Sequence, residues 1–113
     1  MINCIFCKIV NREISADIVY EDDDILAFKD TSPVAPVHVL VIPKKHICCT
    51  NEINATNCQV ISKIFCAIAK LSKDLDLTKG YRIINNCGEY GGQTVNHLHF
   101  HLIGGKQLGW PGV

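Results

Sequence analysis

The chain has 113 residues, of which 48% are hydrophobic and 19% charged, and eleven basic side chains balance eleven acidic ones. A chain of this length forms a hydrophobic core of its own, so we expect a single domain over residues 1–113. The zero net charge gives no reason to expect binding to nucleic acid or to an anionic membrane. We therefore expect the partner to be a small molecule or another protein.

The first residues and the cysteine content favour a cytoplasmic location. No basic segment followed by an apolar one opens the chain, and no apolar run approaches the ~18 residues that a membrane-spanning helix needs. The number of cysteines, seven, is odd, and in a reducing compartment buried thiols are expected rather than disulfides. The Cys4 and Cys7 pair has the spacing of a metal-binding motif, so metal binding and plain burial are both open for it.

The first half of the chain predicts three strands. Apolar runs at 18–21 and 25–28 flank three consecutive aspartates, which is typical of a β-hairpin with a solvated turn. The run at 38–42 is rich in β-branched residues and almost wholly apolar, so we expect a central strand buried on both faces. His38 stands at the entry of this strand, and His46 follows in the polar turn after it.

From about residue 55 to residue 75 the hydrophobic period becomes that of a helix. Isoleucine and leucine recur at steps of three and four residues, and Thr56 with Gln59 resembles a capping box. We expect the one long helix here, lying across a sheet. A strand follows at 81–85, and then a hairpin loop at 86–93 that is rich in glycine.

Three of the five histidines lie in the alternating segment 97–103. On a strand, His97, His99 and His101 would project from one face in a row with a repeat of about 6–7 Å, able to bind a phosphate or a metal. The alternative is a half-buried strand whose exposed face happens to carry histidine. Three histidines within five residues favour the functional site.

The segment Gly91, Gly92, Gln93 and Thr94 comes shortly before the histidines. Glycines let backbone N–H groups approach an anion closely, and a threonine hydroxyl adds a donor. Taken alone, this segment predicts a tight hairpin. Beside the three histidines it also predicts a phosphate cradle, and the two interpretations are compatible.

A second group of residues comprises Cys4, Cys7, His46 and one histidine of the row. Two thiolates and two neutral imidazoles suit tetrahedral Zn²⁺. Four protein ligands leave no open position on the metal, so such a zinc would be structural. The spacing alone does not decide between a zinc site and a chance pair of cysteines.

In their order along the chain, these segments resemble the histidine triad (HIT) superfamily. The segment 97–103 reads His-Leu-His-Phe-His-Leu-Ile, which is the superfamily's defining pattern His-x-His-x-His-x-x with hydrophobic x. The opening Cys-Ile-Phe-Cys, the segments Ala-Phe-Lys-Asp and Gly-Gly-Gln-Thr-Val, and the Gly-Trp-Pro tail match as well, so the resemblance covers nearly the whole chain. The tail makes the chain similar to the nucleotide-binding branch, the purine nucleoside phosphoramidases.

The resemblance implies a role for each matching residue. His99 matches the nucleophile that attacks the α-phosphorus of a nucleoside 5′-phosphoramidate and is transiently nucleotidylated. His38 and His101 match imidazoles around the phosphate, and Thr94 matches a residue that assists the leaving group. Together with the glycine loop, the implied nucleotide-binding set is Ile5, Phe6, Ile9, Phe28, Asp30, Leu40, Asn86, Gly92, Gln93, Thr94, His99, His101 and Trp110.

Within that set the apolar side chains match a purine slot, Asp30 matches a ribose ligand and Asn86 a phosphate contact. In zinc-binding relatives the metal ligands match Cys4, Cys7, His46 and His97. Members of this branch are homodimers whose C-terminal tail approaches the partner's site, which implies that Trp110 shapes the leaving-group pocket. Asn96 and Thr31 depart from residues that are common in the family.

We therefore expect an α+β fold, in which a five-stranded, mainly antiparallel sheet carries one long helix and a short N-terminal helix and dimerises into a ten-stranded sheet. The expected function is hydrolysis of purine nucleoside 5′-phosphoramidates, of AMP-amine or aminoacyl-AMP type, through a nucleotidyl-His99 intermediate. The alternatives are a dinucleoside polyphosphate hydrolase and a nucleotide-binding or scaffolding protein with vestigial activity. The assignment requires His97 to lie near Cys4, Cys7 and His46, while His99 and His101 face the glycine loop and His38.

Overall fold

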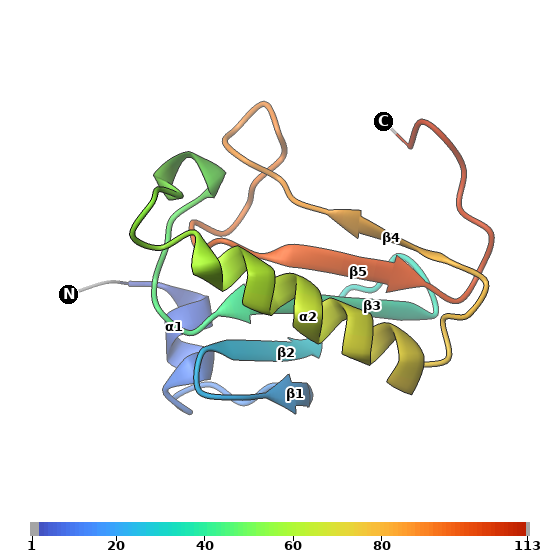
Figure 1. The fold of residues 1–113 in the computed structure, drawn as a ribbon, viewed down its shortest axis with the longest axis horizontal. Coiled ribbons are helices and arrows are strands. Elements are labelled where there is room, and N and C mark those ends of the chain that lie inside the picture. Colours follow the sequence, from blue (N-terminus) through green and yellow to red (C-terminus); the bar gives the residue numbers. More distant parts are fainter. Residues whose placement is uncertain (1–2, 113) are drawn as a thin grey trace.

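The computed structural model describes residues 3–112 and contains one sheet flanked by helices on both faces (Figure 1). The sheet has five strands in the order β1-β2-β3-β5-β4, and every neighbouring pair is antiparallel. The strands are β1 (Ile18–Glu21), β2 (Ile25–Lys29), β3 (Val37–Pro43), β4 (Tyr81–Ile84) and β5 (Phe100–Gly104). The helices are α1 (Ile5–Val10), the 3-10 helix η1 (Thr50–Glu52) and α2 (Gln59–Asp74). The predicted α+β fold is confirmed.

Two hydrophobic cores lie on the two faces of this sheet. In the central strand β3, Val39 and Val41 pack in the core under α2, while Leu40 and Ile42 pack in the core under α1. This division follows from the alternation of side chains along a strand. The prediction that this strand is buried on both faces is confirmed, since its residues from His38 to Pro43 are all buried.

The alternation also places the histidines on the α1 face. Leu102 of β5 belongs to the core under α2, so its neighbour His101 points to the other face, where it pairs in register with Leu40 of β3. His38, adjacent to Val39, points to the same face. The candidate chemistry therefore lies on the side of the sheet covered by the short helix.

The start of the histidine strand was predicted too early. Strand β5 begins only at Phe100, so His97 and His99 precede it. The ladder between β3 and β5 ends with the pair of Val41 and Phe100, although β3 continues to Pro43. Beyond this pair, the Pro43 carbonyl accepts a hydrogen bond from the His97 ring, and the Leu98 amide donates to the carbonyl of Ile47. The centroids of the His99 and His101 rings lie 5.2 Å apart. This is closer than the repeat of about 6–7 Å expected for alternate residues on one face of a strand.

The capping box predicted at the start of the long helix was also wrong. Helix α2 begins at Gln59, its N-cap residue is Cys58, and no side chain caps it. Thr56 instead donates its hydroxyl hydrogen to Asn54 at 2.6 Å, because the residues before the helix form a turn held by the Asn54 side chain. Within residues 3–112, neither α-helix has both the length and the apolarity needed to cross a membrane.

Candidate active site and metal centre

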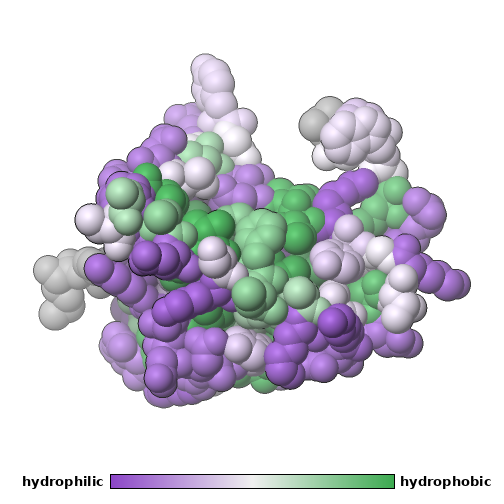
Figure 2. Space-filling view, viewed as in Figure 1, coloured by the Kyte–Doolittle hydropathy of each residue, from purple (hydrophilic) through white to green (hydrophobic). Residues whose placement is uncertain are grey.

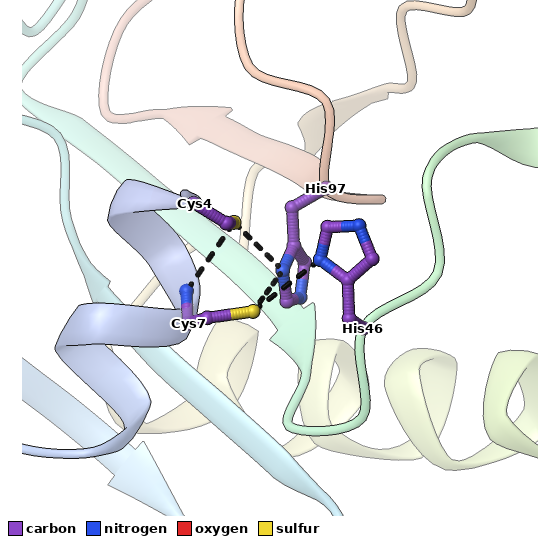
Figure 3. Close-up of side chains that lie close together, drawn as sticks. All are labelled: Cys4, Cys7, His46 and His97. Atoms are coloured by element: carbon purple, nitrogen blue, oxygen red, sulfur yellow. Dashed lines mark hydrogen bonds between the residues drawn. The ribbon is translucent and has the colours of Figure 1, made fainter. Parts of the chain in front are cut away.

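Four predicted metal ligands from three separate segments meet beside α1 (Figure 3). Cys4 and Cys7 lie at the start of α1, His46 in the turn after β3, and His97 before β5. The Sγ atom of Cys4 lies 3.4 Å from Nδ1 of His97, and the Sγ atom of Cys7 lies 3.3 Å from Nδ1 of His46 and 3.6 Å from Nδ1 of His97. The structure thus brings the predicted set together.

This donor set fits a tetrahedral ion. Bond lengths of about 2.3 Å to sulfur and 2.0–2.1 Å to nitrogen imply sulfur-to-nitrogen distances of about 3.6 Å across a tetrahedral zinc site. The three measured distances, between 3.3 and 3.6 Å, come close to that value. The Nε2 atom of His97 donates to the Pro43 carbonyl at 2.8 Å, which leaves Nδ1 unprotonated and free to bind a metal.

The electrostatics of the cluster also matter for metal binding. Burial lowers the pKa of His97 to about 4, so the imidazole is neutral near pH 7, which is its ligating form. Burial, and next the neighbouring Cys4, raise the pKa of the Cys7 thiol to about 11. A bound cation would reverse this preference for the protonated thiol, because it stabilises the thiolate.

His99 is held in one tautomer. Its Nδ1 lies 2.7 Å from the carbonyl oxygen of His97, and since a carbonyl can only accept, Nδ1 carries the proton. The Nε2 atom therefore has a free lone pair. The ring is buried, and it packs edge to face with the Phe6 ring at a distance of 5.2 Å between the ring centroids. His99 thus presents an unprotonated ring nitrogen in a fixed orientation.

His38 and His101 form a chain of hydrogen bonds next to it. The Val34 amide donates to Nδ1 of His38 at 3.1 Å, so the proton of the neutral His38 ring is on Nε2. That Nε2 lies 2.8 Å from Nδ1 of His101 and 3.4 Å from Oδ2 of Asp30. His101 therefore accepts at Nδ1 and keeps its own proton on Nε2, as a donor for an anion.

Burial, and next the neighbouring His99 and His38, lower the pKa of His101 to about 4. His101 is therefore neutral near pH 7 and acts as a neutral donor. Asp30, His38 and His101 lie close enough to be considered as metal ligands. A metal on Nε2 of neutral His38 would move the ring proton to Nδ1, where it would meet the Val34 N–H, so the geometry favours a hydrogen-bond chain here.

Most of the predicted purine slot is packed together in the core under α1. Phe6, Ile9, Phe28 and Leu40 are buried members of one cluster, and the rings of Phe6 and Phe28 meet edge to face at 5.4 Å. Ile5 is separate from them, with 49% of its surface exposed. Contact of these residues with a purine stays a prediction.

The predicted phosphate loop is held by its own amide side chains. Gln93 accepts from the Gly88 amide at 2.9 Å and donates to the carbonyl of Cys48 at 2.8 Å, and Asn86 donates to the Gly91 carbonyl at 2.7 Å. Gly92 has a φ of +81°, which favours glycine. These side chains shape the loop, and their contact with a phosphate stays a prediction.

Thr94 and Trp110 both lie on the surface of the protein. Thr94 is exposed and lines a pocket of about 550 Å³ together with Cys4, His46 and Asn96, beside the metal cluster. Trp110, in the C-terminal tail, is 89% exposed. The leaving-group roles of both residues stay predictions.

Comparison with known proteins matches residues 11–108 to the HIT domain family. The chain belongs to this family. It is 44% identical over 106 residues to the purine nucleoside phosphoramidase of Escherichia coli, covering 93% of this chain and 89% of that protein. An uncharacterized HIT-like protein of Synechococcus elongatus is 50% identical over 107 residues, covering 95% and 94%. A HIT family hydrolase from Legionella pneumophila superposes with a TM-score of 0.96 at 46% identity, covering 98% of this chain and all of that one.

Three residues that hold the HIT histidines were missed by the sequence reasoning. Pro43 and Val34 act through a backbone carbonyl and a backbone amide, so their residue types carried no signal. Asn85 donates its side-chain amide to the carbonyl of His99 at 2.9 Å. A polar residue at the end of a predicted strand was the one available sign of this contact.

Proposed function

We propose that this HIT protein hydrolyses purine nucleoside 5′-phosphoramidates, of AMP-amine or aminoacyl-AMP type, through a nucleotidyl-His99 intermediate. The observation that carries the proposal is the hydrogen bond from Nδ1 of His99 to the His97 carbonyl, which leaves Nε2 free to attack phosphorus. The 44% identity to the Escherichia coli purine nucleoside phosphoramidase supports the substrate class.

In the first step, Nε2 of His99 forms a bond to the α-phosphorus and the bond from phosphorus to the amine nitrogen breaks. The leaving nitrogen takes up a proton from solvent and departs as the amine, and the water that attacks in the second step returns a proton to solvent. The ring then carries positive charge, and its Nδ1–H is held by the His97 carbonyl. In the second step, water attacks phosphorus, which releases the nucleotide and regenerates neutral His99.

The neighbouring histidines stabilise negative charge on the phosphoryl oxygens. Nε2–H of His101 is the donor next to His99, and His38 fixes the ring of His101 through its Nδ1. Donors that are already oriented before the reaction lower the barrier because they need no reorganisation. Asp30, which the resemblance matches to a ribose ligand, lies beside these two histidines. Its Oδ2 atom is 3.4 Å from Nε2 of His38.

A substrate panel tests the proposal. We expect AMP phosphoramidate to be turned over faster than a dinucleoside polyphosphate, with loss of at least about 10³-fold in kcat for His99→Ala, because the nucleophile is removed. Faster turnover of the dinucleoside polyphosphate would favour the alternative hydrolase. Tight AMP binding with negligible turnover of both substrates would favour a nucleotide-binding protein.

We further propose that Cys4, Cys7, His46 and His97 hold a structural Zn²⁺. The donor types, the sulfur-to-nitrogen distances and the orientation of His97 support this identity. When bound, zinc would cross-link α1, the turn after β3 and the segment before β5. Free cysteines are typical of a reducing compartment, which supports the cytoplasmic location expected from the sequence.

Metal analysis of the purified protein tests the zinc proposal. We expect about one zinc per chain in the wild type and loss of zinc in Cys4→Ser, since a four-ligand structural site needs every ligand. Cys58→Ser is the matched control, because Cys58 is an exposed cysteine outside the cluster. Equal zinc in the wild type and Cys4→Ser would contradict the proposal.

We also propose a homodimer joined at strand β4, which lies at one edge of the sheet. An edge strand presents unpaired backbone groups that a second copy can pair with. An apolar area over the middle of α2 is a further surface that a second copy would cover (Figure 2). Phe65 of α2 is 45% exposed, and its ring packs edge to face against Phe100. In that dimer we expect the tail with Trp110 to approach the partner's site.

A further inference from the structure

We infer that Asn85 is a positioning residue that fixes the backbone of the nucleophile His99. This inference rests on the proposed function, in which His99 attacks phosphorus. The Nδ2 atom of Asn85 donates to the carbonyl oxygen of His99 at 2.9 Å, and its Oδ1 accepts from the hydroxyl of Thr50. One side chain thus connects His99 to the segment that follows the metal ligand His46.

The place of Asn85 explains why a side chain is needed here. The ladder between β4 and β5 ends with the pair of Ile84 and His101, so regular strand pairing does not extend to His99. Asn85 is the first residue after β4, and its amide supplies the next connection between the two segments. His99 is only 4% exposed, so its carbonyl would have little access to water without this donor.

His99 is therefore held from three directions. Its Nδ1–H is bound by the His97 carbonyl, its ring is packed by Phe6, and its own carbonyl is bound by Asn85. Fixing the carbonyl restrains the peptide plane on one side of the residue, and fixing Nδ1 restrains the ring. Together they aim Nε2, and a displacement of about 1 Å at such an atom can reduce a rate by up to ~10²-fold.

Asn85 is one of several links between the segments 46–50 and 85–99. The Ile47 carbonyl accepts from the Leu98 amide at 2.6 Å, and the Cys48 carbonyl accepts from the Gln93 side chain at 2.8 Å. The third link is the hydrogen bond from the Thr50 hydroxyl to Oδ1 of Asn85. The segment that begins at His46 therefore contacts the loop before the histidines, the segment of the nucleophile and the end of β4.

Asn57, in the segment that leads into α2, is the matched control. Asn57 also uses both ends of its amide, since Oδ1 accepts from the Asn54 backbone at 2.8 Å and Nδ2 donates to the Glu52 carbonyl at 3.0 Å. Its partners are Glu52, the last residue of η1, and Asn54 in the turn that follows, and neither belongs to the histidine segment. Loss of Asn57 should lower stability without changing the chemistry.

The experiment compares Asn85→Ala, Thr50→Val and Asn57→Ala with the wild type, using AMP phosphoramidate. For Asn85→Ala we expect kcat to fall about 3- to 10-fold at nearly constant KM, which is the effect of one side-chain hydrogen bond lost from an oriented group. Thr50→Val should give a smaller fall in kcat, and Asn57→Ala none. Asn85→Asp, of the same size but without a donor when ionised, should lose at least as much kcat as Asn85→Ala.

A second readout does not depend on turnover. In ¹⁵N NMR spectra, His99 should carry its proton on Nδ1 in the wild type and in Asn57→Ala, with a smaller Nδ1–H population in Asn85→Ala. Wild-type kcat and a wild-type His99 tautomer in Asn85→Ala and Asn85→Asp would overturn the inference, and so would an equal fall in kcat for Asn57→Ala. Absence of turnover in the wild type would contradict the proposed function instead, and the NMR comparison would still decide the role of Asn85.

Discussion

At the scale of residues, different hydrogen-bond partners give like side chains different proton positions. His99 and His101 are close neighbours, yet the His97 carbonyl puts the proton of one on Nδ1 and the His38 ring puts the proton of the other on Nε2. Nε2 of His99 is therefore an acceptor, and Nε2–H of the neighbouring His101 is a donor. This pair suits attack on phosphorus and stabilisation of negative charge on its oxygens.

The donor role of His101 predicts a loss of rate. His101→Ala should lower kcat for AMP phosphoramidate by about 10²–10³-fold, equivalent to about 2.7–4 kcal/mol, which is typical when one oriented donor to a developing oxyanion is removed. Steady-state kinetics of His101→Ala and His99→Ala, measured in parallel with the wild type, test this prediction. A kcat for His101→Ala within twofold of the wild type would rule out the donor role.

The low pKa of His101 also predicts a dependence of stability on pH. The folded state keeps His101 neutral down to about pH 4, whereas an unfolded histidine takes up its proton near its ordinary value of 6.5. Because the unfolded state binds more protons in this window, the free energy of unfolding should fall as the pH is lowered from 6.5 to 4. Urea titrations of the wild type and His101→Asn check this, and an equally steep fall in the variant would refute it.

At the scale of elements, the periodicity of the sequence predicted the hairpin, the central strand and the long helix. The predictions failed where a long-range contact overrides local pattern, as when Pro43 and Ile47 take His97 and Leu98 out of the strand. The tautomers of the histidines were also beyond prediction, because they depend on backbone groups such as the Val34 amide.

The position of α1 predicts an effect of metal removal. Helix α1 has only six residues, too few for independent stability, and its Phe6 and Ile9 pack on the sheet beside the cluster. Chelation of the proposed zinc should therefore lower Tm and increase amide exchange in α1 before it does so in α2. Cys58→Ser treated in the same way serves as the control, and unchanged Tm on complete metal removal would contradict a structural role.

At the scale of the whole molecule, the sheet order leaves β4 at an edge, and the exposed Phe65 of α2 packs against Phe100 of the adjacent strand β5. Size-exclusion chromatography with light scattering should give twice the chain mass of 12.5 kDa. Phe65→Ser should weaken the dimer, because it removes apolar surface that a partner would cover. Lys70→Ser, on the same helix, is the control. A monomer at micromolar concentration would contradict the proposed assembly.

The proposed mechanism requires that Nε2 of His99 becomes covalently bound to the nucleotide. Wild-type protein mixed with AMP phosphoramidate, quenched within milliseconds and digested, should give a peptide with an AMP adduct on His99, and the adduct should be absent in His99→Ala. Turnover of the substrate with no adduct on His99 at any quench time, or with the adduct on another residue, would contradict the account.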